Sequence, residues 1–284
     1  MLVNSKEILR RATKDGYAVP AYNINNLEWT RYILEACEED KSPVIISATP
    51  SAIKYMGGYN VVCNLIKNLM RDLKISVPVA IHLDHGKSFD DCKSAIDAGF
   101  TSVMIDASSF PLERNIEETN KVINYINGRN VGVEAEIGSL NEEDMQDNNL
   151  PQYVSEEDAK TFVFQTGVDF LAPAIGNKHG IYNGEPELDF DLLGSICRAV
   201  KIPLVLHGAS GLDENKIKTA IFCGISKINI NTDIQIAWAN AVRQYLSENK
   251  SVYDPRKIIA SGKHAIKNVV HEKNKLFGSI KRAN

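Results

Sequence analysis

The chain has 284 residues, 44% of them hydrophobic and 24% charged, which is enough for one large α/β barrel or two smaller domains. Its formal net charge of -4 gives no basic surplus, so we expect no nucleic-acid partner and no membrane partner. The five cysteines include no CxxC pair, and no apolar run is as long as a membrane span, so we expect a cytoplasmic protein with reduced thiols.

Strand and helix patterns alternate along the chain after a short N-terminal helix that Asn4 or Ser5 would cap. The predicted strands are short runs rich in β-branched residues, and the predicted helices carry apolar residues three or four positions apart. The strands are YAVPAYNI, VIISAT, VPVAIHLD (77–84), TSVMIDAS, VGVEAEIG, DFLAPAIG, IPLVLHGASG and ISKININ. The helices that follow them cover residues 27–39, 60–73, 89–98, 116–127, 155–167, 188–200, 214–222 and 233–246.

This regular alternation favours a closed (β/α)8 TIM barrel over an open doubly wound sheet. We expect a single barrel domain over residues 1–284, with residues 251–284 as a C-terminal helical extension. In that extension the sequence predicts a turn at 253–256 and a helix near 263–276. Because the extension exceeds the eight repeating units, we expect it to pack on a neighbouring subunit or over the barrel mouth.

Polar side chains gather where the predicted strands end. In a (β/α)8 barrel the carboxyl ends of the strands form the active-site face, so these residues are candidates for chemistry. They are Asn23, Thr49, Asp84, His85, Asp106, Glu136, His179, His207 and Asn229.

Three histidines in this set follow three different strands: His85, His179 and His207. A lone histidine at a strand end is usually only a hydrogen-bonding residue, but three converging imidazoles match a catalytic zinc site with one open position. Glu136 fits either an alternative metal ligand or a carboxylate paired with a nearby cation. No predicted strand ends in a lysine, and Lys227 stands at the start of the eighth, so a Schiff base is disfavoured and a metal is favoured.

Two neighbouring strand exits offer backbone N–H groups for a phosphate. The first is the glycine-rich turn after strand seven, and the second is the start of the helix after strand eight. Phosphate sites in this fold commonly lie after these two strands. The residues concerned are Gly208, Ala209, Ser210, Asn229, Ile230, Asn231 and Thr232.

Taken together, these segments resemble class II (metal-dependent) fructose-bisphosphate aldolases, including the related tagatose-bisphosphate aldolases, over essentially the whole chain. The segments are YAVPAYNINNLEW, SPVIISATP, VPVAIHLDHG, AGFTSVMIDAS, VEAEIG, LAPAIGNKHGIYNGEP, PLVLHGASG, KININ and YDPRK. The resemblance implies reversible aldol cleavage of a ketose 1,6-bisphosphate to dihydroxyacetone phosphate and glyceraldehyde 3-phosphate. It also implies a place in glycolysis and gluconeogenesis, and a homodimer or homotetramer.

The resemblance also implies roles for individual residues. His85, His179 and His207 would bind Zn2+, Glu136 would mark an alternative metal position, and Asp84 would exchange a proton with the C4 oxygen. Ligands to a monovalent cation (Na+ or K+) and to the dihydroxyacetone-phosphate end would be Gly180, Gly208, Ser210, Asn229 and Thr232. The other phosphate would contact Asn23, Thr49 and Arg256, the last from a partner subunit.

A second proton carrier is implied on the polar loop 139–151, where Glu143 matches the family position. Relatives usually have two glycines before the acidic pair, whereas this chain has Asn141 and one residue fewer, so Glu142 competes with Glu143. We favour Glu143.

Several alternatives stay open. HGASG and SATP look more like the tagatose members, whereas YMGG, NINT, APAIG and YDPRK look more like the fructose members, so we favour fructose 1,6-bisphosphate. A zinc hydrolase on the same barrel usually has an HxH pair on the first strand, which AYNIN lacks. A non-catalytic binding subunit would not need Asp84 and three histidines.

Overall fold

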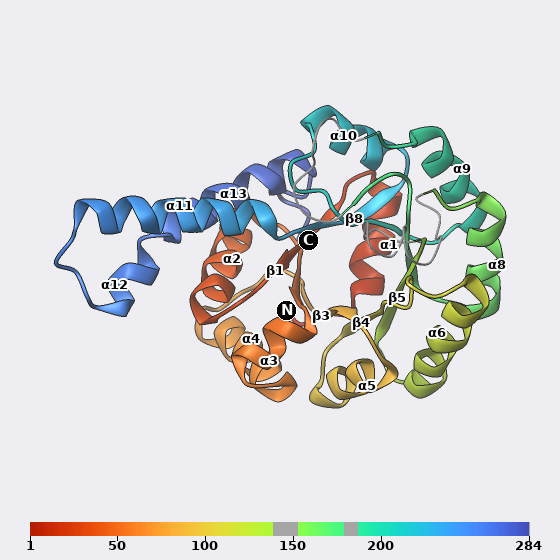
Figure 1. The fold of residues 1–284 in the computed structure, drawn as a ribbon, viewed down its shortest axis with the longest axis horizontal. Helices are drawn as coiled ribbons and strands as arrows, with labels where there is room; N and C mark the ends of the chain where they lie inside the picture. Colours follow the sequence, from red (N-terminus) through yellow and green to blue (C-terminus); the bar gives the residue numbers. More distant parts are fainter. Residues whose placement is uncertain (139–152, 179–186, 284) are drawn as a thin grey trace.

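The computed structural model describes residues 1–138, 153–178 and 187–283. Within these residues, eight parallel strands close into a barrel in sequence order (Figure 1). The strands are β1 Val19–Asn23, β2 Val44–Ala48, β3 Val79–Gly86, β4 Ser102–Ile105, β5 Gly132–Ile137, β6 Phe170–Pro173, β7 Leu204–Leu206 and β8 Ile225–Ile230. This arrangement confirms the predicted (β/α)8 barrel.

Helices cover the outside of the barrel, and many begin and end at the residues that the sequence indicates. Ser88 and Ser155, for example, accept a hydrogen bond from the first turn of their helices, and Gly99 and Gly167 end those helices in the left-handed conformation. The helices up to the eighth strand are α1 Ser5–Asp15, α2 Leu27–Asp40, α3 Pro50–Met56, α4 Tyr59–Asp72, α5 Phe89–Ala98, α6 Leu112–Ile126, α8 Glu156–Thr166, α9 Phe190–Val200 and α10 Glu214–Phe222. The sequence did not predict α3.

The barrel interior changes from apolar to polar along the strands. At the amino ends, α1 closes the barrel with Leu9 and Ala12 over a small apolar cluster. That cluster comprises Val19, Ala21, Ile45, Ala80, Phe170, Ala172 and Val205. Further along the strands the buried side chains include His82, Glu134 and Lys227. Polar groups therefore face the barrel interior only toward its carboxyl-terminal end.

The chain after β8 forms three helices, and the last one completes the outer ring. They are α11 Thr232–Glu248, α12 Pro255–Ala260 and α13 Lys263–Leu276. Helix α13 packs on α2, and the Tyr22 hydroxyl of β1 donates a hydrogen bond to Asn274 Oδ1 at 2.9 Å. In contrast, α11 and α12 extend away from the barrel and form an arm, residues 232–262 (Figure 1).

Two details of the C-terminus differ from the expectation. The helix at 263–276 does not lie over the mouth, because its apolar face, with Ile266 and Val270, lies buried against the protein's own barrel; contact of the extension with a neighbouring subunit stays a prediction. The segment 253–256 is not a simple turn, because Asp254 caps α12 and Pro255 occupies its first helical position, where proline is well tolerated.

The place of α13 in the ring makes a prediction about stability. Val270→Ala should lower the free energy of unfolding by about 1.5–3 kcal/mol, because it leaves a cavity at a fully buried position. Val61→Ala on α4 removes the same two methyl groups from a side chain that is 49% exposed, and should cost less than about 0.5 kcal/mol. Urea unfolding at one protein concentration measures both; equal losses would contradict the assigned position of α13.

Candidate active site

A cavity of about 480 Å³ opens at the carboxyl ends of the strands. It brings together most of the residues that the sequence singled out, from six different strands or the loops after them. These are Asn23, Thr49, Asp84, His85, Asp106, His207, Gly208, Ala209, Ser210, Asn229, Asn231 and Thr232. The cavity wall also contains Pro50, Ser51 and Lys87, which the sequence analysis did not select.

A bulge at the end of β3 brings two consecutive side chains to this cavity. The pairing between β3 and β4 shifts between Leu83 and Gly86, and His85 has a φ of 50°, which is unusual for a residue other than glycine. Strict strand alternation would place His82 and Asp84 on the inner face and His85 on the outer one. Strand alternation therefore does not account for the position of His85, whose side chain the bulge delivers to the cavity.

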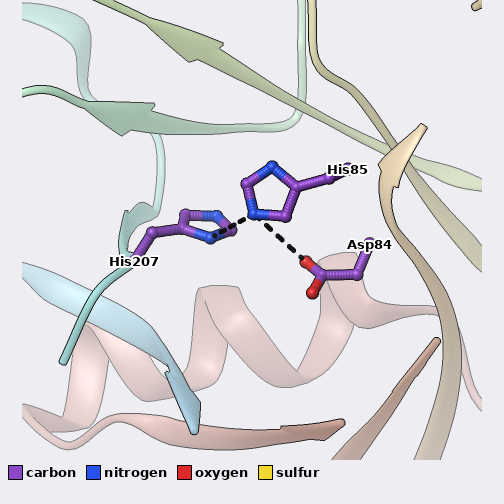
Figure 2. Close-up of side chains that lie close together, drawn as sticks. All are labelled: Asp84, His85 and His207. Carbon is purple, nitrogen blue, oxygen red and sulfur yellow. Dashed lines mark hydrogen bonds and ion pairs between the residues drawn. The ribbon is translucent and has the colours of Figure 1, made fainter. Parts of the chain in front are cut away.

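The imidazoles of His85 and His207 lie next to each other at the cavity, edge to face, with ring centroids 4.7 Å apart. His85 Nε2 lies 3.1 Å from His207 Nδ1 and 4.0 Å from Asp84 Oδ1, so one nitrogen points toward both neighbours (Figure 2). A tetrahedral zinc ion holds two imidazole nitrogens about 3.3 Å apart, so the observed separation suits a metal. Two groups of described residues could bind one, namely Asp84–His85–His207 and His85–Asp106–Glu136.

Each imidazole is held from behind by a carboxylate. His85 Nδ1 donates a hydrogen bond to Asp106 Oδ2 at 2.8 Å, and His207 Nε2 donates one to Glu134 Oε1 at 2.8 Å. Carboxylates in this position orient histidine ligands in metal sites and select the nitrogen that carries the proton. Sequence analysis assigned no role to Asp106, although its place after β4 was a usable signal.

The electrostatic surroundings favour a cation between these groups. Burial lowers the pKa of His85, but the carboxylates of Asp84 and Asp106 outweigh that effect and raise it to about 9. Burial lowers the pKa of His207, and the Glu134 hydrogen bond only partly offsets it. In the metal-free protein, His85 is therefore the histidine of this pair that carries protons on both ring nitrogens. Its Nε2 lies next to the other candidate ligands.

Asp84 is held in place by two asparagines. Asn23 Nδ2 donates a hydrogen bond to Asp84 Oδ2 at 2.7 Å, and Asn229 Nδ2 donates one to Oδ1 at 2.9 Å. Burial raises the pKa of this carboxyl, but the positive charges of His85 and Lys227 hold it well below its usual value. Asp84 is therefore an oriented carboxylate at neutral pH.

Glu136 behaves as a carboxyl group that lacks a cation. Burial and the charge of Asp106 raise its pKa to about 8, and Oε2 is buried with no hydrogen-bond partner. A buried carboxylate oxygen without a partner is costly, whereas a bound metal would satisfy it. The donor set of His85, Asp106 and Glu136 thus fits a divalent ion.

Some predicted site residues lie elsewhere. The side chain of Ile230 is buried in the core outside the barrel strands, so only its backbone could reach a ligand. The Arg256 side chain is 89% exposed on the arm and does not line the cavity. His179, Gly180, Glu142 and Glu143 lie outside the described residues.

None of the eight described strands ends in a lysine, as the sequence predicted. Strand β3 nevertheless runs two residues beyond the predicted end, so Lys87 directly follows it and reaches the cavity wall. The ammonium of Lys87 lies 2.6 Å from Asp106 Oδ2, within the carboxylate–histidine arrangement.

The barrel and its mouth define an enzyme-like site of paired histidines and carboxylates, and comparison with known proteins supplies its class. The family model "Fructose-bisphosphate aldolase class-II" matches residues 3–282. The chain is 51% identical to the fructose-bisphosphate aldolase of Geobacillus stearothermophilus and 48% identical to that of Staphylococcus aureus strain N315, covering 99% of both chains in each case. The crystal structure of the YdjI aldolase from Escherichia coli K12 superposes with a TM-score of 0.87 at 36% identity, covering 100% of each chain.

The chain therefore belongs to the class II fructose-bisphosphate aldolase family and is a class II aldolase. This confirms the resemblance inferred from the sequence. Members of this family generally depend on a metal ion. None of the described helices could cross a membrane.

The loop after β7 makes a prediction about two glycines. A Cβ atom at Gly208 (φ +65°) would lie 2.1 Å from the Lys178 carbonyl oxygen, whereas one at Gly211 (φ +82°) would meet nothing within 4 Å. Gly211→Ala should cost roughly 1–2 kcal/mol of stability for backbone strain alone. Gly208→Ala should also displace the loop and lower kcat/KM for aldol cleavage at least about tenfold. Unfolding measures the stability of the two variants, and steady-state kinetics measure their kcat/KM. Equal activity of the two variants would contradict the close approach of Gly208 to the Lys178 carbonyl.

Proposed function

We propose that this protein catalyses the reversible cleavage of fructose 1,6-bisphosphate to dihydroxyacetone phosphate and glyceraldehyde 3-phosphate with a catalytic zinc ion. The observation that carries the proposal is the grouping of His85, His207 and Asp84 at the barrel mouth. The substrate follows the names of the relatives, which at 51% and 48% identity are fructose-bisphosphate aldolases. Tagatose 1,6-bisphosphate, which differs only at C4, is the alternative.

His85 and His207 would bind the zinc ion, with His179 as the third ligand and Glu136 as an alternative position. Support comes from the paired imidazole nitrogens, the carboxylates behind them and the unpartnered Oε2 of Glu136. The bound ion would supply a Lewis acid that polarises the ketose carbonyl and stabilises the negative charge that develops during cleavage.

Asp84 would accept the proton of the C4 hydroxyl as the bond between C3 and C4 breaks. The C4 oxygen then becomes the aldehyde oxygen of glyceraldehyde 3-phosphate, and C3 retains the electron pair. In the synthetic direction Asp84 returns the same proton. The two asparagine hydrogen bonds support this role, because they aim a charged carboxylate into the cavity before substrate arrives.

Glu143, with Glu142 as its competitor, would deliver the proton to C3. This part of the proposal rests on the family resemblance alone.

The phosphate of the dihydroxyacetone end would bind at the exits of β7 and β8. Helix α11 begins at Thr232, and its N-cap residue Asn231 makes no side-chain capping bond, so the first-turn N–H groups are available to an anion. Gly208, Ala209 and Ser210 line the same cavity. A monovalent cation, Na+ or K+, would share this region with Gly180, Gly208 and Ser210.

The second phosphate would bind near Asn23 and Thr49, with Arg256 from a partner subunit. Arg256 does not line its own cavity; it belongs to α12, which lies at the end of the projecting arm (Figure 1), and Tyr253 is 90% exposed. A homodimer or homotetramer in which the arm covers a neighbouring mouth would explain both exposures.

We also propose that residues 1–284 act as one domain, and that the enzyme is cytoplasmic and serves glycolysis and gluconeogenesis. Its five cysteines are all free thiols.

Two substitutions separate proton transfer from metal binding. Asp84→Ala should retain zinc but lower kcat about 10²–10⁴-fold, because it removes the proton acceptor. His207→Ala should lose zinc, since it removes a ligand. Elemental analysis of the purified proteins measures metal content, and a coupled assay for triose phosphate measures cleavage.

The same assay on the wild-type enzyme decides the proposal as a whole. Cleavage should disappear with a chelator and return with zinc, and kcat/KM should be higher for fructose than for tagatose 1,6-bisphosphate. A preference for tagatose would reverse the assignment of the substrate. Absence of cleavage at every metal loading would refute the aldolase proposal in favour of a hydrolase or a binding subunit, and full zinc in His207→Ala would refute the ligand set.

The position of Arg256 can be tested by subunit mixing. Arg256→Ala should lower kcat/KM about 10–100-fold, because a charged hydrogen bond to phosphate is lost. Refolding it together with inactive His207→Ala should restore part of the activity, since one mixed site would have both an intact metal centre and an intact arginine. If the mixture is no more active than the sum of its components, Arg256 does not act across subunits.

A further inference from the structure

A carboxylate lies behind each of the two histidines of the site, and each carboxylate also contacts a lysine. Behind His207, Glu134 accepts from the imidazole through Oε1, and Lys227 Nζ lies 2.6 Å from its other oxygen, Oε2. Behind His85, Asp106 Oδ2 accepts from both the imidazole and Lys87 Nζ, the latter at 2.6 Å. Each candidate ligand is therefore part of a histidine–carboxylate–lysine chain.

Lys227 has no part in the proposed reaction, yet it lies in an unfavourable place for a charge. Its side chain is fully buried within the barrel on β8, below the cavity that substrate would enter. Burying an ammonium and a carboxylate together usually stabilises a fold no better than apolar side chains of the same size. The pair therefore calls for an explanation other than stability.

His82 and Ser102 fix the other side of Lys227. His82 Nδ1 lies 2.6 Å from Ser102 Oγ, and His82 Nε2 lies 3.4 Å from Lys227 Nζ. An ammonium can only donate, so Nε2 must accept and the proton of a neutral His82 lies on Nδ1. Burial and the charge of Lys227 lower the pKa of His82 to about 3, in agreement with a neutral ring. Lys227 Nζ is thus held between two acceptors, His82 Nε2 and Glu134 Oε2, in a fixed arrangement.

We infer that Lys227 is a positioning residue for metal binding. It holds Glu134 Oε2, so that Oε1 accepts a hydrogen bond from Nε2 of His207. The lone pair on Nδ1 of His207 then faces His85. This inference rests on the proposed metal site. A neutral imidazole carries one proton, so the nitrogen that donates to Glu134 determines which nitrogen can bind a metal. A carboxylate that could rotate freely would orient the ring less well.

Lys87 is the matched control within the same protein. It also lies 2.6 Å from a carboxylate behind a histidine, although it shares Asp106 Oδ2 with His85, and its side chain is 61% exposed, so water and salt can replace it. The inference therefore predicts unequal effects of the same substitution at two lysines. Lys227→Met should weaken zinc binding about 10–100-fold, as substitutions behind metal ligands commonly do, whereas Lys87→Met should change it less than about threefold.

The test measures the zinc dissociation constant of each folded variant by competition with a chromophoric chelator, with circular dichroism to establish folding. Cobalt(II) absorption provides a second readout of ligand geometry, which should change in Lys227→Met and not in Lys87→Met. If Lys227→Met does not fold, Lys227→Leu, which is also unable to donate to Oε2, should weaken zinc binding at least about fivefold. Zinc affinity within threefold of wild type in a folded Lys227 variant would overturn the inference.

A double-substitution cycle tests whether Lys227 acts through Glu134. Glu134→Gln should weaken zinc binding by itself, and adding Lys227→Met should cause no more than about a twofold further loss. Fully multiplicative losses would show that the lysine acts by another route and would overturn the inference. Failure of the wild-type protein to bind zinc would instead refute the proposed metal site, so the two failures are distinguishable.

Discussion

The site depends on one backbone constraint, the left-handed conformation of His85 at the end of β3. A residue other than glycine in this region costs on the order of 1–3 kcal/mol, and the surrounding structure must compensate for it. Here the compensation is visible, because the His85 imidazole is held by Asp106 and lies against His207. In return, the bulge places Asp84 and His85, the proposed proton carrier and metal ligand, side by side, which a regular strand cannot do.

The second determinant is the polar layer inside the barrel. Below the cavity, His82, Glu134 and Lys227 satisfy one another's hydrogen-bonding groups in a region without water access, and an apolar cluster closes the barrel beneath them. Such a network is favourable only when its members are satisfied together. This requirement links the proposed metal site to strands β3, β4, β5 and β8 of the barrel.

Different helices complete the barrel wall and form the projecting arm. Helix α13 completes the ring and carries Val270 against β1, while the arm leaves the barrel before the chain returns. This order places an exposed tyrosine and arginine far from their own cavity without breaking the barrel wall. A catalytic group shared between subunits would then require no change to the fold.

The sequence by itself determined the barrel, since hydrophobic periodicity and capping residues such as Ser88 and Gly99 are local signals that survive without tertiary information. It also determined which residues stand at the strand ends, because that position follows from the order of elements. Only the tertiary structure decided that His85 turns inward, that Asp106 and Glu134 stand behind the histidines, that Lys227 lies beneath them, and that α13 replaces α11 in the ring. These features depend on a bulge, on side-chain rotation and on packing between residues far apart in the chain, none of which a local pattern encodes.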